Sequence, residues 1–209
     1  LVPTSYRFLR ETAEGSGIPL NDISSQCSGG LSNCTLSPTL ANGVYIANGN
    51  LTLNGSGYTF PINKNFVILI NGSLIIKERI LVPIGSTVIF SAKNNIRVDK
   101  TVGEPAATTC NIENHAGCSI EGLYSADNNF ITGGTNNCAV GPDLRLNIAG
   151  SVIANAGRTG TRFGFVNSRT LCAANSSNPS VSFIERPDFI LNYPNFVQQT
   201  TRAWQDVAP

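Results

Sequence analysis

The sequence predicts an all-β protein, a β-solenoid or parallel β-helix, and three observations support that fold class. Short apolar segments follow one another between residues 40 and 100, turns rich in Asn and Gly separate them, and some segments are apolar throughout. Strands this short bury little alone, whereas stacked coils give every strand neighbours on both sides. Continuous apolar runs such as FVILI (66–70) and TVIF (87–90) suit strands that are buried on both faces.

The predicted strands and the turns between them recur along the chain. The strands are 44–46, 51–53, 66–70, 74–76, 87–90 and 96–98, with Asn-Gly or Gly-Ser turns at 42–43, 48–49, 54–55, 71–72 and 85–86. Asn and Gly tolerate the positive φ of sharp turns. A unit of Gly, then Ser or Asn, then apolar residues begins at Gly49, Gly72, Gly85 and Gly150. Since Asn-Gly is also a strong hairpin signal, an antiparallel β-sandwich is the alternative fold.

The chain divides into three expected parts. Residues 1–20 form an extended arm and linker, because Val2, Tyr6 and Phe8 would share one face of a strand and residues 11–17 are polar. The arm either packs on its own domain or pairs with a neighbouring molecule. Residues 21–180 form the solenoid domain, with a Cys-containing insertion at about 101–142. Residues 181–209 form an aromatic tail that is expected to pack on the solenoid.

Six cysteines favour disulfides over a zinc site: Cys27, Cys34, Cys110, Cys118, Cys138 and Cys172. Zinc sites use close pairs of ligands, whereas this chain has no CxxC pair and one histidine, His115. Six cysteines allow 15 connectivities. Short spacing favours pairing Cys27 with Cys34 and Cys110 with Cys118, which would leave Cys138 with Cys172. Disulfides indicate an oxidising compartment, so we expect an extracellular or cell-surface location.

The composition argues against several classes of partner. Charged residues make up 13% of the chain and the net charge is +1, so no basic cluster favours nucleic acid or anionic lipid. No apolar run reaches the roughly 18 residues of a membrane span. Methionine is absent, so we expect that an export signal was removed ahead of Leu1.

No motif in the sequence indicates catalysis, so we expect no enzyme, no cofactor and no metal site. Asp127 and Asp143 are acids that could meet in space, but their spacing gives no reason for it. His115 lies between two cysteines, where a solvated histidine is the common case. Five sequons mark potential glycosylation sites, Asn33, Asn50, Asn54, Asn71 and Asn175.

Several segments carry a family resemblance. They are GVYIANGNLTLNG (43–55), NGSLII (71–76), GSTVIFSAKNNIRVD (85–99), IEGLYSADNNFITGG (120–134), RLNIAGSVIANAG (145–157) and RPDFILNYPNFVQQTTRAWQDVAP (186–209). In this order they resemble a group of uncharacterised exported β-solenoid surface proteins of uncultivated, small-genome bacteria. The resemblance covers roughly residues 40–209 and implies a β-helical fold and a surface or secreted location. It supplies no catalytic residues.

The leading functional hypothesis is a self-assembling subunit of an extracellular filament or surface layer. Its partner would be a second copy, which accepts the N-terminal strand at an open sheet edge. The expected interface residues are Val2, Tyr6, Phe8 and Trp204. The alternative is a surface carbohydrate-binding or adhesive module in which Tyr45, Tyr58, Phe60 and Tyr124 stack on glycans. Glycans, bound or covalently attached, are therefore the second expected class of partner.

Overall fold

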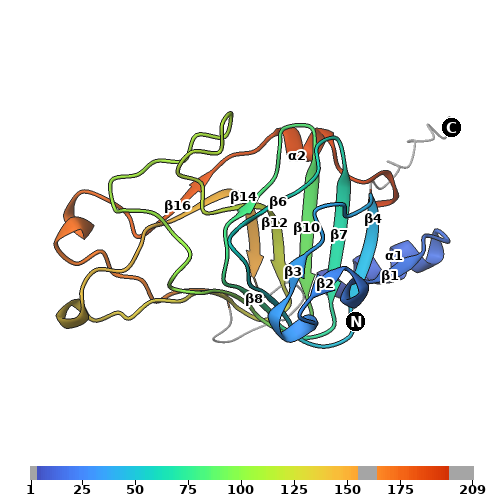
Figure 1. Cartoon of the computed structure of the whole chain (residues 1–209), viewed down its shortest axis with the longest axis horizontal. Helices are drawn as coiled ribbons and strands as arrows, with labels where there is room; N and C mark the ends of the chain where they lie inside the picture. Colours follow the sequence, from blue (N-terminus) through green and yellow to red (C-terminus); the bar gives the residue numbers. More distant parts are fainter. Residues whose placement is uncertain (1–3, 155–163, 198–209) are drawn as a thin grey trace, which may run out of the picture.

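The computed structural model describes residues 4–154 and 164–197, whose regular secondary structure is mostly β-strand (Figure 1). The first sheet holds, in this order, β1 (Leu20–Asp22), β4 (Gly43–Ala47), β7 (Asn65–Ile70), β10 (Thr87–Ala92), β12 (Ile120–Ala126), β14 (Leu146–Ala154) and β16 (Val181–Ile184). The second sheet holds β5 (Leu51–Leu53), β8 (Leu74–Ile76), β11 (Ile96–Val98), β13 (Phe130–Thr132) and β15 (Phe165–Asn167). Two short strands, β6 (Tyr58–Thr59) and β9 (Ile80–Leu81), join the first sheet through β12.

Both sheets are parallel, and the pairing follows the chain from one turn of the backbone to the next. In the first sheet Val44 lies opposite Val67, Val67 opposite Ile89, and Ile89 opposite Leu123. The antiparallel pairings in the described part of the chain are β2 (Cys27–Ser28) with β3 (Thr35–Leu36) and one bridge in a loop. The fold is therefore β-rich and parallel β-helix-like, and the alternative of an antiparallel sandwich is wrong.

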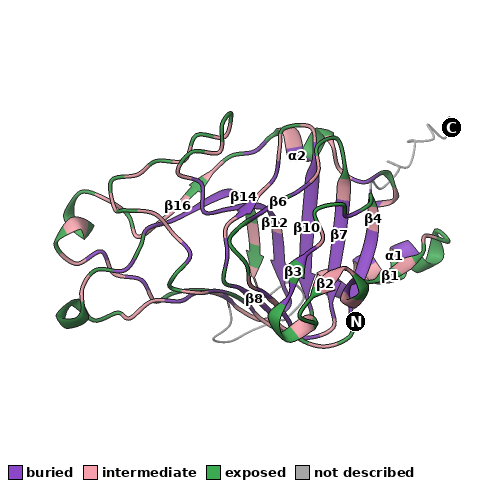
Figure 2. Ribbon diagram, in the orientation of Figure 1, coloured by how far each residue is buried: buried purple, intermediate pink, exposed green. Residues whose placement is uncertain are grey.

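The continuously apolar strands are buried on both faces, as the sequence predicts. In β7, Phe66 and Ile68 belong to the main core between the sheets, whereas Val67 and Leu69 belong to a second cluster on the outer face. The strands β4 and β10 alternate in the same way. Figure 2 shows these central strands as buried along most of their length. The outer cluster requires a cover, and a helix provides it.

Helix α1 (Ser5–Gly15) covers the outer face of the first sheet, so the prediction of an extended strand at residues 1–10 is wrong for the residues described. The apolar contacts of α1 come from Tyr6, Leu9 and Ala13, whose spacing follows the helical period. Thr4 caps the helix by accepting a hydrogen bond from the Arg7 amide. The polar stretch that reads as a linker forms the C-terminal part of this helix, where Glu11 and Glu14 are exposed and Ala13 is buried.

The predicted insertion at about 101–142 is also wrong in its extent, because β12 and β13 lie inside it. In β12, Glu121, Gly122 and Ser125 interrupt the apolar residues, and β13 has only two apolar residues before Thr132, so neither strand stands out in the sequence. The irregular segments are 99–119, 133–145 and 168–180, and they extend together beyond the strands on the left of Figure 1. The chain then continues through β16 into α2 (Asp188–Leu191).

Candidate functional site: two unlike ends of the strand stack

A ladder of polar side chains fixes the stacking at one corner. The Asn50 Oδ1 accepts from the Ser73 amide at 2.8 Å, and the Ser73 Oγ accepts from the Asn95 amide at 3.4 Å. The Asn95 Oδ1 accepts from the Asn129 amide at 3.1 Å, and the Asn129 Oδ1 accepts from the Gly164 amide at 2.9 Å. Each rung satisfies an amide of the next coil. The ladder explains the recurring Gly-Asn and Gly-Ser units at Gly49 and Gly72.

The unit at Gly150 serves a different purpose. Gly150 lies opposite Gly122 in the pairing of β14 with β12, and both glycines have positive φ, 135° and 139°. A Cβ atom at Gly150 would meet the Gly122 carbonyl oxygen at 2.0 Å. Glycine is required here because the two backbones bend and approach each other closely.

The N-terminal end of the stack is covered by a compact segment that we call the cap, residues 20–40. Its strands β2 and β3 are tied by the Cys27–Cys34 disulfide. Cys34 also extends the second sheet, since its amide donates to the Thr52 carbonyl at 2.8 Å. Ile23, Leu36 and Leu40 are buried in the main core. The outside of the cap is polar, so the core is closed at this end.

The C-terminal end, which we call the open end, consists of β15, β16 and the second half of β14. Within the described residues β15 pairs only with β13, and β16 only with β14. Phe183 is 53% exposed and Phe165 is 43% exposed, and Val166 is exposed beside them. These two rings lie 5.6 Å apart, and Phe165 stacks on Phe130 at 5.7 Å. An aromatic column that begins in the core thus reaches the surface here.

The chain that leaves β16 is anchored by a buried ion pair. The Arg186 guanidinium lies 3.1 Å from the Glu121 carboxylate and 2.7 Å from that of Asp188, and it donates to the Val82 carbonyl. Glu121 also accepts from the Val82 amide at 2.7 Å. Phe189 follows in the main core, with the Arg186 guanidinium 4.1 Å from its ring centre. The open end is therefore fastened at one corner while its strand edges stay exposed.

The long loops beside the open end are held by buried polar groups. Arg169 donates to the carbonyls of Val102, Leu144 and Asp99. Burial lowers the pKa of this guanidinium to about 10. Burial alone would raise the pKa of Asp143, but hydrogen bonds from Thr170, Thr135 and the Asn136 amide outweigh it and lower the pKa. These contacts make the loops an ordered lobe that the Cys138–Cys172 disulfide closes.

The structure contains three disulfides. Two of them, Cys27–Cys34 and Cys110–Cys118, join the cysteines that short spacing favours, and the third joins the remaining pair, Cys138–Cys172. Cys110 and Cys118 come close to Glu121, but sulfurs joined in a disulfide are not thiolates and make poor metal ligands. Disulfides persist in oxidising compartments. The bonded cysteines therefore indicate a location outside the cytoplasm.

Of the expected interface residues, the two that the structure describes do not lie at a free edge. Tyr6 is buried against the sheet and Phe8 is half-buried beside it. Val2 and Trp204 lie outside the described residues. The aromatic residues proposed for glycan stacking, Tyr45, Tyr58, Phe60 and Tyr124, are all in the core, so that placement is wrong. These four aromatic side chains pack in the main core instead.

The acids and the histidine considered for catalysis belong to separate networks. Asp127 accepts from the Tyr6 amide at 3.4 Å, whereas Asp143 accepts from Thr135 and Thr170. The His115 Nδ1 lies 2.9 Å from the buried Glu121 carboxylate. The cluster of Glu121, Arg186 and His115 joins residues from separate parts of the chain, and no local sequence signal marks it.

The sequon asparagines lie at exposed or half-buried corners and loops. The Asn54 amide donates to the Asn33 Oδ1 at 2.6 Å, and Asn71 accepts from Lys93 at 3.2 Å. The Asn175 amide nitrogen donates to Thr170 at 3.0 Å. The exposed Asn50 uses its carbonyl oxygen in the corner ladder, and its amide nitrogen makes no hydrogen bond within the described residues. Glycosylation at these positions stays a prediction.

Comparison with protein-family models, with curated proteins and with solved structures finds no match to this chain. In residues 4–154 and 164–197, no helix has the length and apolar composition needed to cross a bilayer.

Proposed function

We propose that the chain is an extracellular, non-catalytic structural module whose strands form a β-solenoid and whose open end pairs with the open end of a second copy. The observation that carries the proposal is the exposed end of the aromatic column, Phe165 and Phe183, beside two strand edges without partners among the described strands. Disulfides support the extracellular location.

Unpaired strand edges and exposed aromatic rings favour association. An edge presents backbone donors and acceptors in a row, and soluble proteins usually protect it with charges, proline or a covering segment. The strands β15 (FVN) and β16 (VSFI) contain no charged residue and no proline. Two copies can therefore approach without charge repulsion, and burial of Phe165 and Phe183 contributes about 25 cal/mol for each Å² removed from water.

The partner that fits this end is another open end rather than the cap. The cap closes the core and carries a charge at its edge, since Asp22 ends β1 and is exposed. Contact between two open ends is self-complementary and closes as a two-fold dimer. A dimer of this kind would be the building unit of any filament or surface layer. Helix α1 gives the donated-strand route no support, because Tyr6 and Leu9 are buried on their own sheet.

A charge placed on the open end tests the proposal. We expect wild-type protein to sediment as a dimer that dissociates on dilution, and Phe183→Asp to sediment as a monomer with unchanged circular dichroism. The matched control is Ile62→Asp, since Ile62 is 63% exposed and lies between β6 and β7, away from this end. A monomeric wild type, or equal association of the two variants, would contradict the proposal.

A further inference from the structure

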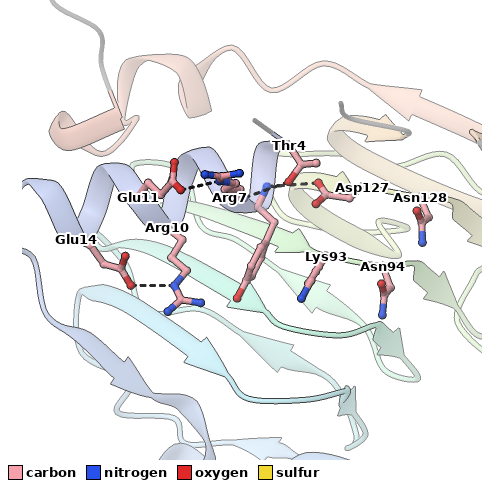
Figure 3. A pocket seen from close by; sticks show the side chains of 10 residues that line it. Thr4, Arg7, Arg10, Glu11, Glu14, Lys93, Asn94, Asp127 and Asn128 are labelled. Atoms are coloured by element: carbon pink, nitrogen blue, oxygen red, sulfur yellow. Dashed lines mark hydrogen bonds and ion pairs between the residues drawn. The ribbon is translucent and has the colours of Figure 1, made fainter. Parts of the chain in front are cut away.

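A polar cavity of about 550 Å³ lies between helix α1 and two corners of the strand stack (Figure 3). The helix contributes Tyr6, Arg7 and Arg10, while the corners after β10 and β12 contribute Asn94 and Asn128. This volume is in the range of small-molecule sites. The cavity lies at the side of the strand stack, and none of the residues that line it belongs to the open end.

The charges around the cavity cancel. Arg7 pairs with Glu11 at 2.6 Å and Arg10 pairs with Glu14 at 2.9 Å, as Figure 3 shows. Lys93 and Asp127 add one charge of each sign. An anionic ligand would compete with the glutamates for the two arginines, and a cationic ligand would compete with the arginines for the two glutamates. A neutral ligand with many hydroxyl groups can bond to both kinds of side chain without breaking the pairs.

One buried group at the cavity lacks a partner. The proton of the Tyr6 hydroxyl has no acceptor within the described residues, although Tyr6 is only 5% exposed. The neighbouring Arg10 guanidinium can only donate to this hydroxyl, and its Nε already donates to Glu14. Burial raises the pKa of the Tyr6 phenol, so the hydroxyl keeps its proton and remains a donor. A buried hydroxyl without a partner is costly, and a ligand oxygen would satisfy it.

The amides of Asn94 and Asn128 add donors and acceptors on the opposite side of the cavity. Their side chains make no hydrogen bond within residues 4–154 and 164–197, and Figure 3 shows both beside Lys93 and Asp127. We propose that this cavity binds a neutral saccharide, which the Tyr6 hydroxyl and these amides recognise through its hydroxyl groups. The inference is independent of association at the open end.

Calorimetric titration of the full chain tests the site. The neutral probes are maltotriose, cellotriose and triacetylchitotriose, and the acidic probe is trigalacturonic acid. We expect at least one neutral probe to bind and the acidic probe to bind more weakly. Tyr6→Phe should weaken binding roughly five- to tenfold, because it removes one hydrogen bond of about 1 kcal/mol. It should leave the folded state intact, since the lost hydroxyl donates to no group within the described residues.

The control is Tyr58→Phe, which removes a buried hydroxyl that donates to the Ser37 carbonyl at 2.8 Å, away from the cavity. We expect this variant to lose stability but to bind the saccharide as the wild type does. Three results would overturn the inference: no binding of any neutral probe, tighter binding of trigalacturonic acid, or equal affinity of Tyr6→Phe and the wild type. None of these results bears on dimer formation.

Discussion

The two ends of the strand stack solve the same problem in opposite ways. A stack of parallel coils exposes the edge of its core wherever it stops. At the cap, a disulfide-tied hairpin and the side chains of Ile23, Leu36 and Leu40 close the core. At the open end, Phe189 and Arg186 fasten one corner, but Phe165 and Phe183 stay exposed. The cap therefore contributes to the stability of the core, and under the proposed function the open end is the surface that associates.

The largest expected effect comes from the anchor of the open end. Replacing Arg186 by Met leaves the buried Glu121 carboxylate without its cation, which should cost about 3–5 kcal/mol in the free energy of unfolding. Urea denaturation measures it. The double variant Arg186→Met, Glu121→Gln should lose less, because it no longer leaves the fully buried Glu121 charge without its cation. Equal losses in the single and double variants would contradict the role of this ion pair.

The next effect compares the two ends directly. Ile23→Ala in the cap should destabilise the fold by about 2–5 kcal/mol, because Ile23 is fully buried in the core. Phe183→Ala at the open end should change the stability of the monomer by no more than about 0.5 kcal/mol. Thermal unfolding of dilute samples gives both values. Similar losses at both positions would show that the open end is packed as tightly as the cap.

An effect smaller than that of Ile23→Ala is expected close to the cap. The Glu78 carboxylate is buried, accepts one bond from the Gly57 amide and has an oxygen without a partner among the described residues. Burial raises the pKa of Glu78. The folded state therefore holds this proton to higher pH than the unfolded chain does, so the group costs stability as pH rises through its ordinary range.

Glu78→Gln removes that cost, and it should stabilise the protein by about 1 kcal/mol at neutral pH. The gain should vanish as the pH falls below about 4, where the carboxyl is protonated in both states. Melting temperatures of the variant and the wild type across this pH range check the sign. A gain that grows toward low pH would contradict it.

The sequence predicts the strands of the two sheets better than the structure of the N-terminal residues. Apolar runs such as 66–70 and turns such as Asn71-Gly72 are local signals, so the fold class and most early strands follow from them. Close spacing also favoured the observed disulfide pairs. The strand predicted from Val2, Tyr6 and Phe8 is wrong for the described residues, because Leu9 and Ala13 join Tyr6 in a helical stripe.

The candidate surfaces depend on contacts that no local pattern encodes. Arg186 meets Glu121 across 65 residues, and Tyr6 faces a cavity whose other wall comes from Asn94 and Asn128. The exposure of Phe183 follows from its place in the last strand of the first sheet, which composition does not reveal. Stacking order decides which aromatic residues reach the surface.

Amide hydrogen exchange at two protein concentrations tests the central claim most directly, because it reads the two edges separately. If two open ends pair, the amides of Val181 and Phe183, which face away from β14, gain protection as the concentration rises, whereas the outward-facing amide of Asp22 in β1 does not. Protection of β16 that is the same at both concentrations, or a gain at β1 instead, would contradict the account.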